Sequence, residues 1–183
     1  MYVGVEEGGI FRSRNEGATF ETLNDGLYED VHTVAVDSRD SRRLYATTGA
    51  GFYLSENRGS SWRLVKRGLC RSYTVPLFVA AGESGAVFTA AAAGPPPFWS
   101  AGAAGADSVM FRSNDGGQSF QALGDEVLPE RAMVMRFRAD PESAGDFFAV
   151  TTDGSVIRTR TMAEESTLIA ERLPPAYDLV ALP

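Results

Sequence analysis

Short apolar runs alternate with polar turns along the whole chain. The alternation of apolar and polar positions, rich in β-branched and aromatic residues, predicts four successive strands at residues 31–37, 44–48, 52–55 and 62–65. Two further groups of four strands are predicted downstream, at 73–80, 86–92, 109–113 and 119–123, and at 133–139, 146–151, 155–160 and 166–172. Each group is long enough for one antiparallel sheet of four strands. The pattern therefore predicts an all-β fold built from such sheets.

A motif of eleven residues occurs three times along the chain, beginning in a predicted strand and running into the turn that follows it. It reads apolar-x-Ser-x-Asn/Asp-x-Gly-x-Ser/Thr-aromatic and occurs at residues 10–20, 52–62 and 110–120. The second interval between copies is longer than the first and holds an insertion. A period of roughly 40 to 50 residues is typical of propellers and solenoids. The recurring positions are Ser13, Asn15, Gly17 and Phe20, then Ser55, Asn57, Gly59 and Trp62, then Ser113, Asp115, Gly117 and Phe120.

The motif describes a β-hairpin in which Asn or Asp bonds the turn, Gly supplies a positive φ, and the aromatic residue opens the next strand. It resembles the Asp-box (BNR) repeat of sialidase-type propellers, sortilin-type receptors, xyloglucan-cleaving enzymes and photosystem-assembly-factor-like proteins. The resemblance covers residues 1 to about 120. It implies a single β-propeller domain over residues 1–183, in which the boxes serve the fold. The expected blades span about 1–26 with 174–183, 27–68, 69–127 and 128–173, and the fourth lacks a box.

The two ends of the chain are expected to complete one blade. Residues 2–5 read as a second strand and residues 177–182 as a first strand, so the C-terminal strand would complete the N-terminal blade, within one chain or within a dimer. Four blades are fewer than the resembling propellers have, and we expect N-terminal blades of longer relatives to be missing. A homodimer of two open halves is favoured over a self-closed ring.

Composition narrows the classes of function. A net charge of −7 with 17 scattered basic residues argues against a nucleic-acid or membrane partner. No apolar stretch approaches the roughly 20 residues that cross a bilayer, and residues 1–2 do not open a signal segment, so we expect a cytoplasmic protein. Cys70 and His32 are the only residues of their kinds, which excludes an intrachain disulfide and a multi-histidine zinc site within one chain.

Candidate functional residues lie where first strands begin, at the face where propellers usually bind ligands. Asp30, His32 and Asp178 are candidate catalytic residues and candidate ligands of a divalent metal ion. A Pro-rich insertion at 91–107 either covers a site or subunit contact, or packs on its own blade. The candidate ligand-binding residues are Arg71, Tyr73, Arg131 and Tyr177, with Phe98 and Trp99 of the insertion. The alternative for the charged residues is that they are solvated strand ends.

Two hypotheses of function follow. The first is a binding or scaffold module whose channel-top face contacts a small molecule, a glycan or a protein. The second is a hydrolase of an ester, phosphoester or glycoside, in which Asp30, His32 and Asp178, with or without a divalent metal, activate water in the channel or at a dimer junction. No other cofactor is indicated. The arginine triad of sialidases and the facing aspartates of xyloglucan-cleaving enzymes are not recognisable in the sequence.

Overall fold

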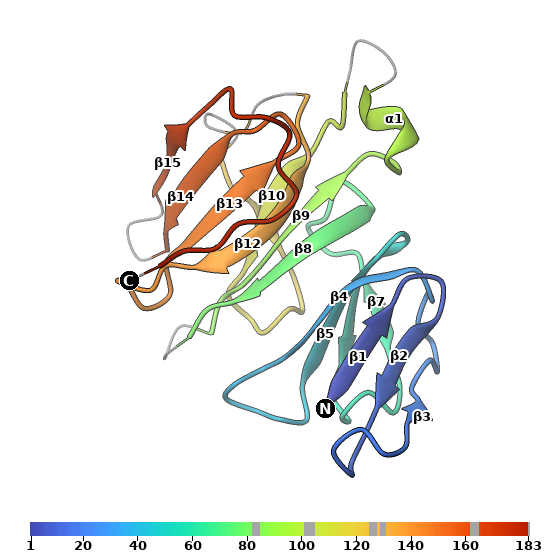
Figure 1. Cartoon of the computed structure of the whole chain (residues 1–183). Coiled ribbons are helices and arrows are strands. Elements are labelled where there is room, and N and C mark those ends of the chain that lie inside the picture. Colours follow the sequence, from blue (N-terminus) through green and yellow to red (C-terminus); the bar gives the residue numbers. More distant parts are fainter. Residues whose placement is uncertain (82–84, 101–104, 125–127, 129–130, 162–164, 183) are drawn as a thin grey trace.

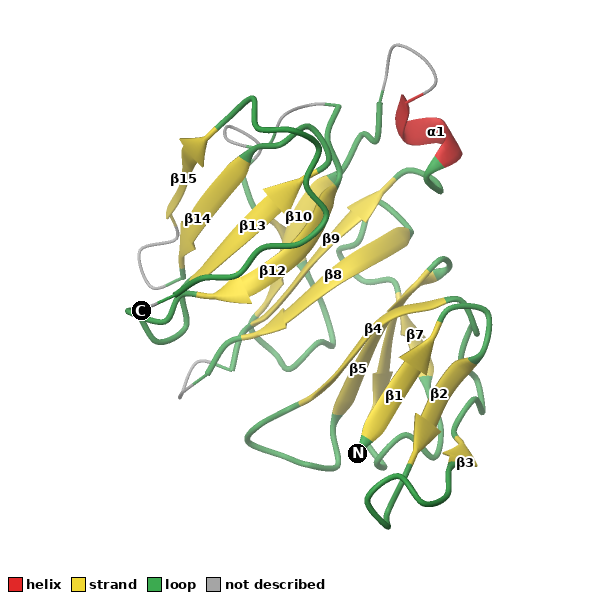
Figure 2. Cartoon of the chain, viewed as in Figure 1, coloured by secondary structure: helices red, strands yellow, loops and turns green. Residues whose placement is uncertain are grey.

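Four antiparallel sheets stand side by side around an open arc (Figure 1). The structure is a computed structural model, and it describes residues 1–183 except 82–84, 101–104, 125–127, 129–130, 162–164 and 183, and except the side chains of Phe98 and Ser100. Strands make up nearly all of the regular structure (Figure 2). Helix α1 (Pro97–Ser100) interrupts them once within the described residues. No described helix has the length and apolar character needed to cross a bilayer.

Each sheet is a meander in which consecutive strands are neighbours. The first sheet contains β1 (Tyr2–Val5), β2 (Gly9–Arg12) and β3 (Glu21–Thr22). The second contains β4 (Val31–Val36), β5 (Leu44–Thr48), β6 (Gly51–Ser55) and β7 (Arg63–Val65). The third contains β8 (Tyr73–Val79), β9 (Val87–Ala92), β10 (Val109–Ser113) and β11 (Gln121–Ala122). The fourth contains β12 (Val134–Ala139), β13 (Phe147–Thr151), β14 (Val156–Arg160) and β15 (Glu165–Ala170). The all-β fold predicted from the sequence is confirmed.

The hydrophobic core lies between neighbouring sheets. The inner strands β4, β8 and β12 contact one another in that order, and β1 lies beside β4. Ile10 of the first sheet packs with Leu44 of the second, Phe52 of the second packs with Phe111 of the third, and a third cluster joins the third sheet to the fourth. Because each apolar face is covered by the next sheet, burial fixes the order of the sheets.

Strand β1 corresponds to the second strand of the other sheets. It pairs with β2 in the register in which β5 pairs with β6, placing Val3 opposite Phe11 as Ala46 lies opposite Tyr53. The second strands β5 and β9 are buried throughout, whereas Val3 and Val5 of β1 are 37% and 40% exposed. The first sheet therefore presents a free inner edge.

The C-terminal segment does not complete this edge within the chain, so of the two alternatives closure in one chain is not observed. Residues 177–182 form no strand and lie beside β12, at the other end of the arc. Arg138 Nε donates a hydrogen bond to the carbonyl of Leu179 at 3.1 Å, and the Asp178 carboxylate pairs with Arg138 at 2.9 Å. These guanidinium contacts hold the segment on the fourth sheet, and the arc stays open.

The three repeat turns, residues 13–20, 55–62 and 113–120, share one set of hydrogen bonds. In the first, Ser13 Oγ accepts the Gly17 amide at 2.8 Å and Asn15 Oδ1 accepts the Thr19 amide at 2.9 Å. The same two bonds recur at 2.9 and 2.9 Å in the second turn and at 2.8 and 2.9 Å in the third. The polar side chains of the motif are thus used inside their own turns, as the structural interpretation predicts.

In two of the three turns, the aromatic residue that ends the turn packs against the preceding sheet. The Trp62 amide donates to the carbonyl of Asp25 at 2.8 Å, and the Phe120 amide donates to the carbonyl of Arg67 at 3.0 Å. Trp62 and Phe120 are 6% and 4% exposed, whereas Phe20 is 48% exposed. Two of the three aromatic residues therefore fasten one sheet to the next, and Phe20 has no described sheet to meet.

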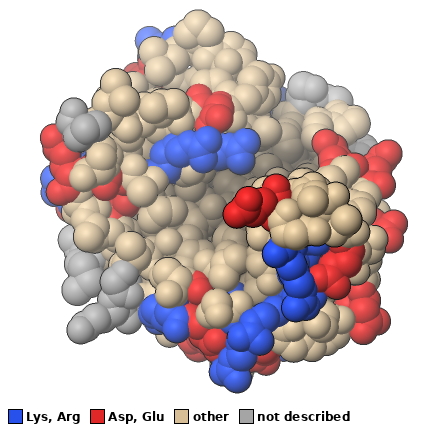
Figure 3. Space-filling model, turned by 60° about the horizontal axis from the view of Figure 1, so that its bottom comes forward, with Lys and Arg blue, Asp and Glu red and all other residues tan. Residues whose placement is uncertain are grey.

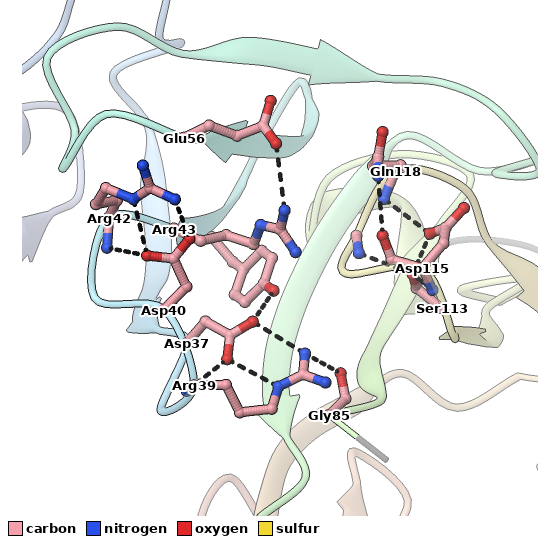
Figure 4. A network of polar contacts seen from close by, with 12 residues as sticks. Asp37, Arg39, Asp40, Arg42, Arg43, Glu56, Gly85, Ser113, Asp115 and Gln118 are labelled. Atoms are coloured by element: carbon pink, nitrogen blue, oxygen red, sulfur yellow. Dashed lines mark hydrogen bonds and ion pairs between the residues drawn. The ribbon is translucent and has the colours of Figure 1, made fainter. Parts of the chain in front are cut away.

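A buried carboxylate joins the second and third sheets at their lower end (Figure 4). The side chain of Asp37 is 1% exposed, accepts the Tyr45 hydroxyl at 2.8 Å and pairs with Arg39 at 3.1 Å. Arg39 also donates to the carbonyl of Gly85 in the third sheet at 3.1 Å. Burial opposes ionisation of Asp37, but the bonds from Arg39 and Tyr45 outweigh it and lower its pKa below the usual 3.8.

Replacing Asp37 by Asn should weaken the acid dependence of stability. Because the folded-state pKa is lowered, Asp37 stabilises the fold above about pH 4, and this contribution is lost as the pH falls below 3.8. Asp37→Asn should lower the free energy of unfolding by about 1–3 kcal/mol at pH 7 and flatten its decline below pH 4. Urea titrations between pH 2 and 7 measure both, with the exposed Glu16→Gln as control. An unchanged acid slope would contradict the assignment.

Candidate functional site

Four of the predicted residues gather where the inner strands begin. Asp30 precedes β4, His32 lies in β4, Tyr73 opens β8 and Trp99 lies in α1. The His32 and Tyr73 ring centroids are 4.8 Å apart, and Tyr73 and Trp99 meet edge to face at 5.8 Å. We call Asp30, His32, Tyr73 and Trp99 the top-face cluster, because α1 marks the upper end of the arc in Figure 1.

The orientation of His32 is fixed by the neighbouring inner strand. Its Nδ1 lies 2.6 Å from the carbonyl oxygen of Thr74, which can only accept, so Nδ1 carries the proton. Its Nε2 therefore faces Asp30 Oδ1, 3.5 Å away. The side chains of His32 and Asp30 are 11% and 23% exposed. The pair thus presents one imidazole nitrogen and one carboxylate at a partly open surface.

The surroundings of the cluster are acidic. Burial, followed by the negative charges of Asp30 and Glu6, raises the pKa of Tyr73 to about 12, so its phenol stays neutral. A shallow pocket of about 450 Å³ adjoins Asp30 and is lined by Glu7, Leu27, Tyr28, Glu29 and Asp30. Carboxylates and aromatic rings therefore share this end of the arc.

A second pocket lies between the second and third sheets. It has a volume of about 380 Å³, and Leu64, Leu69, Cys70 and Arg71 are among its lining residues. Arg71 is bound to the insertion: its Nε donates to the carbonyl of Asp107 at 2.9 Å and its guanidinium pairs with the Asp107 carboxylate at 2.7 Å. The insertion thus packs against its own sheet at this point, and Arg71 is turned toward Asp107.

The remaining predicted residues have contacts outside the cluster or lie outside the described side chains. Asp178 and Tyr177 lie on the C-terminal segment, where Asp178 pairs with Arg136 and Arg138 of β12. The Arg131 carbonyl accepts the Ala106 amide at 3.2 Å. The side chain of Phe98 lies outside the described residues. No group of three His, Cys, Asp or Glu side chains suited to a metal ion occurs among the described residues, so the proposed metal set of His32, Asp30 and Asp178 is not assembled.

Sequence reasoning missed the residues that shape the cluster. A Cβ atom on Gly49 would collide with the Asp30 carboxylate and come within 3.4 Å of the Tyr73 ring, so the glycine leaves room for that carboxylate in its present position. The Thr74 carbonyl that orients His32 is a backbone group, so the type of residue at position 74 does not indicate this contact. Glu6, which acts on Tyr73, belongs to the hairpin turn of the first sheet and could have been found only from the packing of that sheet on the second.

Comparison with solved structures identifies the fold. No protein-family model and no curated protein matches the sequence. The chain is similar to an ancestral GH74 enzyme, with a TM-score of 0.67 and 21% identity over 86% of this chain and 20% of that one. It is similar to the GH74 xyloglucanase from Xanthomonas campestris, with a TM-score of 0.66 and 16% identity over 92% of this chain and 28% of that one. The fold is that of a β-propeller.

A further similar propeller is YCF48 bound to D1 peptide, with a TM-score of 0.58 and 16% identity over 87% of this chain and 48% of that one. The chain therefore spans less than half the length of each of these structures. In the terms of a propeller, the four sheets are blades and the inner strands face the channel. The top-face cluster lies at the ends of the blades where the inner strands begin.

The lower end of the propeller differs from the upper end in charge. Turned so that this end comes forward, the molecule shows basic and acidic side chains mixed around a central hollow (Figure 3). Two carboxylates that follow inner strands are paired with arginines, Asp37 with Arg39 and Asp140 with Arg158. Such neutralised pairs leave the acidic and aromatic upper end as the more distinctive binding surface.

Proposed function

We propose that this chain is a binding module of the Asp-box propeller type whose top-face cluster holds a cationic side chain of a peptide or protein ligand. The observation that carries the proposal is the Asp30 carboxylate beside the packed rings of His32, Tyr73 and Trp99. The hydrogen bonds shared by the three repeat turns support the Asp-box assignment.

A cation suits this surface for two reasons. Aromatic rings attract a guanidinium or ammonium group placed over their faces, by about 0.5–2 kcal/mol for each contact. The carboxylates of Glu6, Glu29 and Asp30 add a negative field at the same end, and the chain as a whole carries a net charge of −7. An anionic ligand would meet these charges without a described compensating arginine in the cluster.

One structural neighbour supports a peptide ligand. YCF48 is a propeller whose structure contains a bound peptide, and it shares the fold of this chain. The hydrolase hypothesis depended on Asp178 joining His32 and Asp30, but the contacts of Asp178 are with Arg136 and Arg138. The cluster holds a single carboxylate beside its imidazole at 3.5 Å. Binding is therefore the function that we propose.

A titration followed by NMR tests the proposal. Two acetylated, amidated peptides of Gly and Ser, one with a central Arg and one with a central Glu, are added to the labelled chain. The Arg peptide should shift the amide signals around residues 30–32, 73–74 and 99, and the Glu peptide should not. Asp30→Asn and Trp99→Ala should each weaken binding about tenfold, equivalent to about 1.4 kcal/mol.

Glu142→Gln, at the lower end, is the matched control and should leave the affinity unchanged. Equal binding of the two peptides, or shifts that avoid the cluster, would overturn the proposal. Binding of xyloglucan oligosaccharides in place of the Arg peptide would instead assign the same surface to a glycan.

A further inference from the structure

The inner edge of the first blade carries apolar residues whose counterparts in the second blade are buried. In the first blade these residues are exposed. By the shared register, Val3 and Val5 correspond to Ala46 and Thr48 of β5. Both of those residues are fully buried, whereas Val3 and Val5 are 37% and 40% exposed. In the second blade the strand that pairs with these positions is β4, which places Val34 opposite Ala46. The first blade thus lacks a described partner strand opposite Val3.

Phe20 is exposed on the same side of the first blade as these residues. Its counterparts Trp62 and Phe120 are inserted against the preceding blade, where their amides bind a carbonyl just before Gly26 and Gly68. Phe20 is 48% exposed, and Met1, whose side chain reaches Gly17 of the same turn, is 61% exposed. An apolar face with an unused docking residue is suited to another blade surface.

The C-terminal segment supplies the missing strand at the opposite end of the arc. Residues Leu179-Val180-Ala181 repeat the apolar run Val34-Ala35-Val36 of β4. The segment lies along the inner strand β12, held through Arg138, which is where an inner strand of a following blade would lie. Leu179 and Ala181 are half-buried against the fourth blade, whereas Val180 and Leu182 are each 79% exposed. This alternation is that of a strand with one covered face.

We propose that two copies of this chain join head to tail, each copy lending its C-terminal segment as the inner strand opposite β1 of the other. Val34 faces the preceding blade, as Leu179 does, so aligning Leu179 with Val34 places Leu179 of one copy opposite Val3 of the second. Phe20 of the second copy then docks on the segment that follows β15 of the first. A two-fold axis makes both junctions equivalent, so the pair closes into a ring without free sheet edges.

Disulfide trapping between two different variants tests the strand pairing. In a Cys70→Ser background, one preparation carries Val3→Cys and another carries Leu179→Cys, and the two are mixed and oxidised. Paired antiparallel residues have Cβ atoms about 4.5–5.5 Å apart, near enough for a disulfide after a small adjustment. The mixture should give a cross-linked pair at least about tenfold more abundant than Gln121→Cys mixed with Leu179→Cys. Gln121 is an exposed outer-strand control.

Native mass spectrometry supplies the second measurement. The unmodified chain should have twice the 19.6 kDa chain mass. Val180→Asp with Leu182→Asp should convert it to a monomer with an unchanged circular dichroism spectrum, because both side chains are exposed in the single chain. A monomeric parent chain at about 50 µM, a disulfide formed only within a Val3→Cys/Leu179→Cys chain, or an open-ended polymer would each overturn the proposal. None of these results bears on peptide binding at the top-face cluster.

Discussion

Gly68→Ala should destabilise the protein by about 2–5 kcal/mol. Gly68 has a φ of +82°, which costs an alanine about 1–2 kcal/mol, and the added Cβ would collide with the backbone carbonyl of Phe120. That carbonyl cannot move freely, because the Phe120 amide is bound to Arg67 on the other side of the same glycine. The change therefore separates the second blade from the third, and overpacking adds about 1–3 kcal/mol.

Urea denaturation of Gly68→Ala beside Gly124→Ala isolates the effect. A Cβ atom added at Gly124 would meet no other atom within 4 Å, and this glycine lies outside the left-handed region. Its replacement should therefore change stability by less than about 0.5 kcal/mol. If both variants unfold at the same urea concentration, Gly68 does not fasten the blades in the way described.

Trp62→Ala should cost about 3–5 kcal/mol, which is the usual loss for removing a large buried aromatic side chain. Trp62 is 6% exposed and lies in the core between the first and second blades. Its indole Nε1 also donates to the carbonyl of Leu23 at 2.8 Å. The variant therefore loses packing and leaves a buried carbonyl without its donor.

Two companion variants separate these contributions. Trp62→Phe keeps most of the ring and should cost about 1–2 kcal/mol, mainly for the lost hydrogen bond. Phe20→Ala, at the equivalent turn position, should change the unfolding of the isolated chain by less than about 1 kcal/mol, because Phe20 is 48% exposed. Equal losses for Trp62→Ala and Phe20→Ala in dilute solution would contradict the distinction between docked and free turns.

Much of the fold could be predicted because its determinants are local. The alternation over residues 44–48 and 52–55 and the turn chemistry of Ser55, Asn57 and Gly59 are encoded within a few residues. The convergence of His32 and Tyr73 was also predictable, since both lie near the start of an inner strand and such starts meet at one end. The short helix α1 was not, because Pro-rich sequence indicates only a stiff loop.

The position of the C-terminal segment could not be predicted from its own pattern. Residues 177–182 were predicted as a first strand, but they form no strand, and their place is set by Arg138, which is distant in sequence. The same reasoning applies to Asp178, whose carboxylate was expected near His32 and is paired with arginines of β12. Nor does the motif distinguish Phe20 from Trp62, because burial depends on whether another blade covers that side.

The bonds from Trp62 to Asp25 and from Phe120 to Arg67 also shape how cooperatively the chain unfolds. Each blade touches only its neighbours, so the free energy of the arc is approximately a sum of blade terms and junction terms along one dimension. In the isolated chain, the second and third blades have a packed neighbour on both sides, whereas the first and fourth have one on a single side. Local opening of the isolated chain therefore begins at the terminal blades and proceeds inward, and the middle pair forms its most slowly exchanging unit.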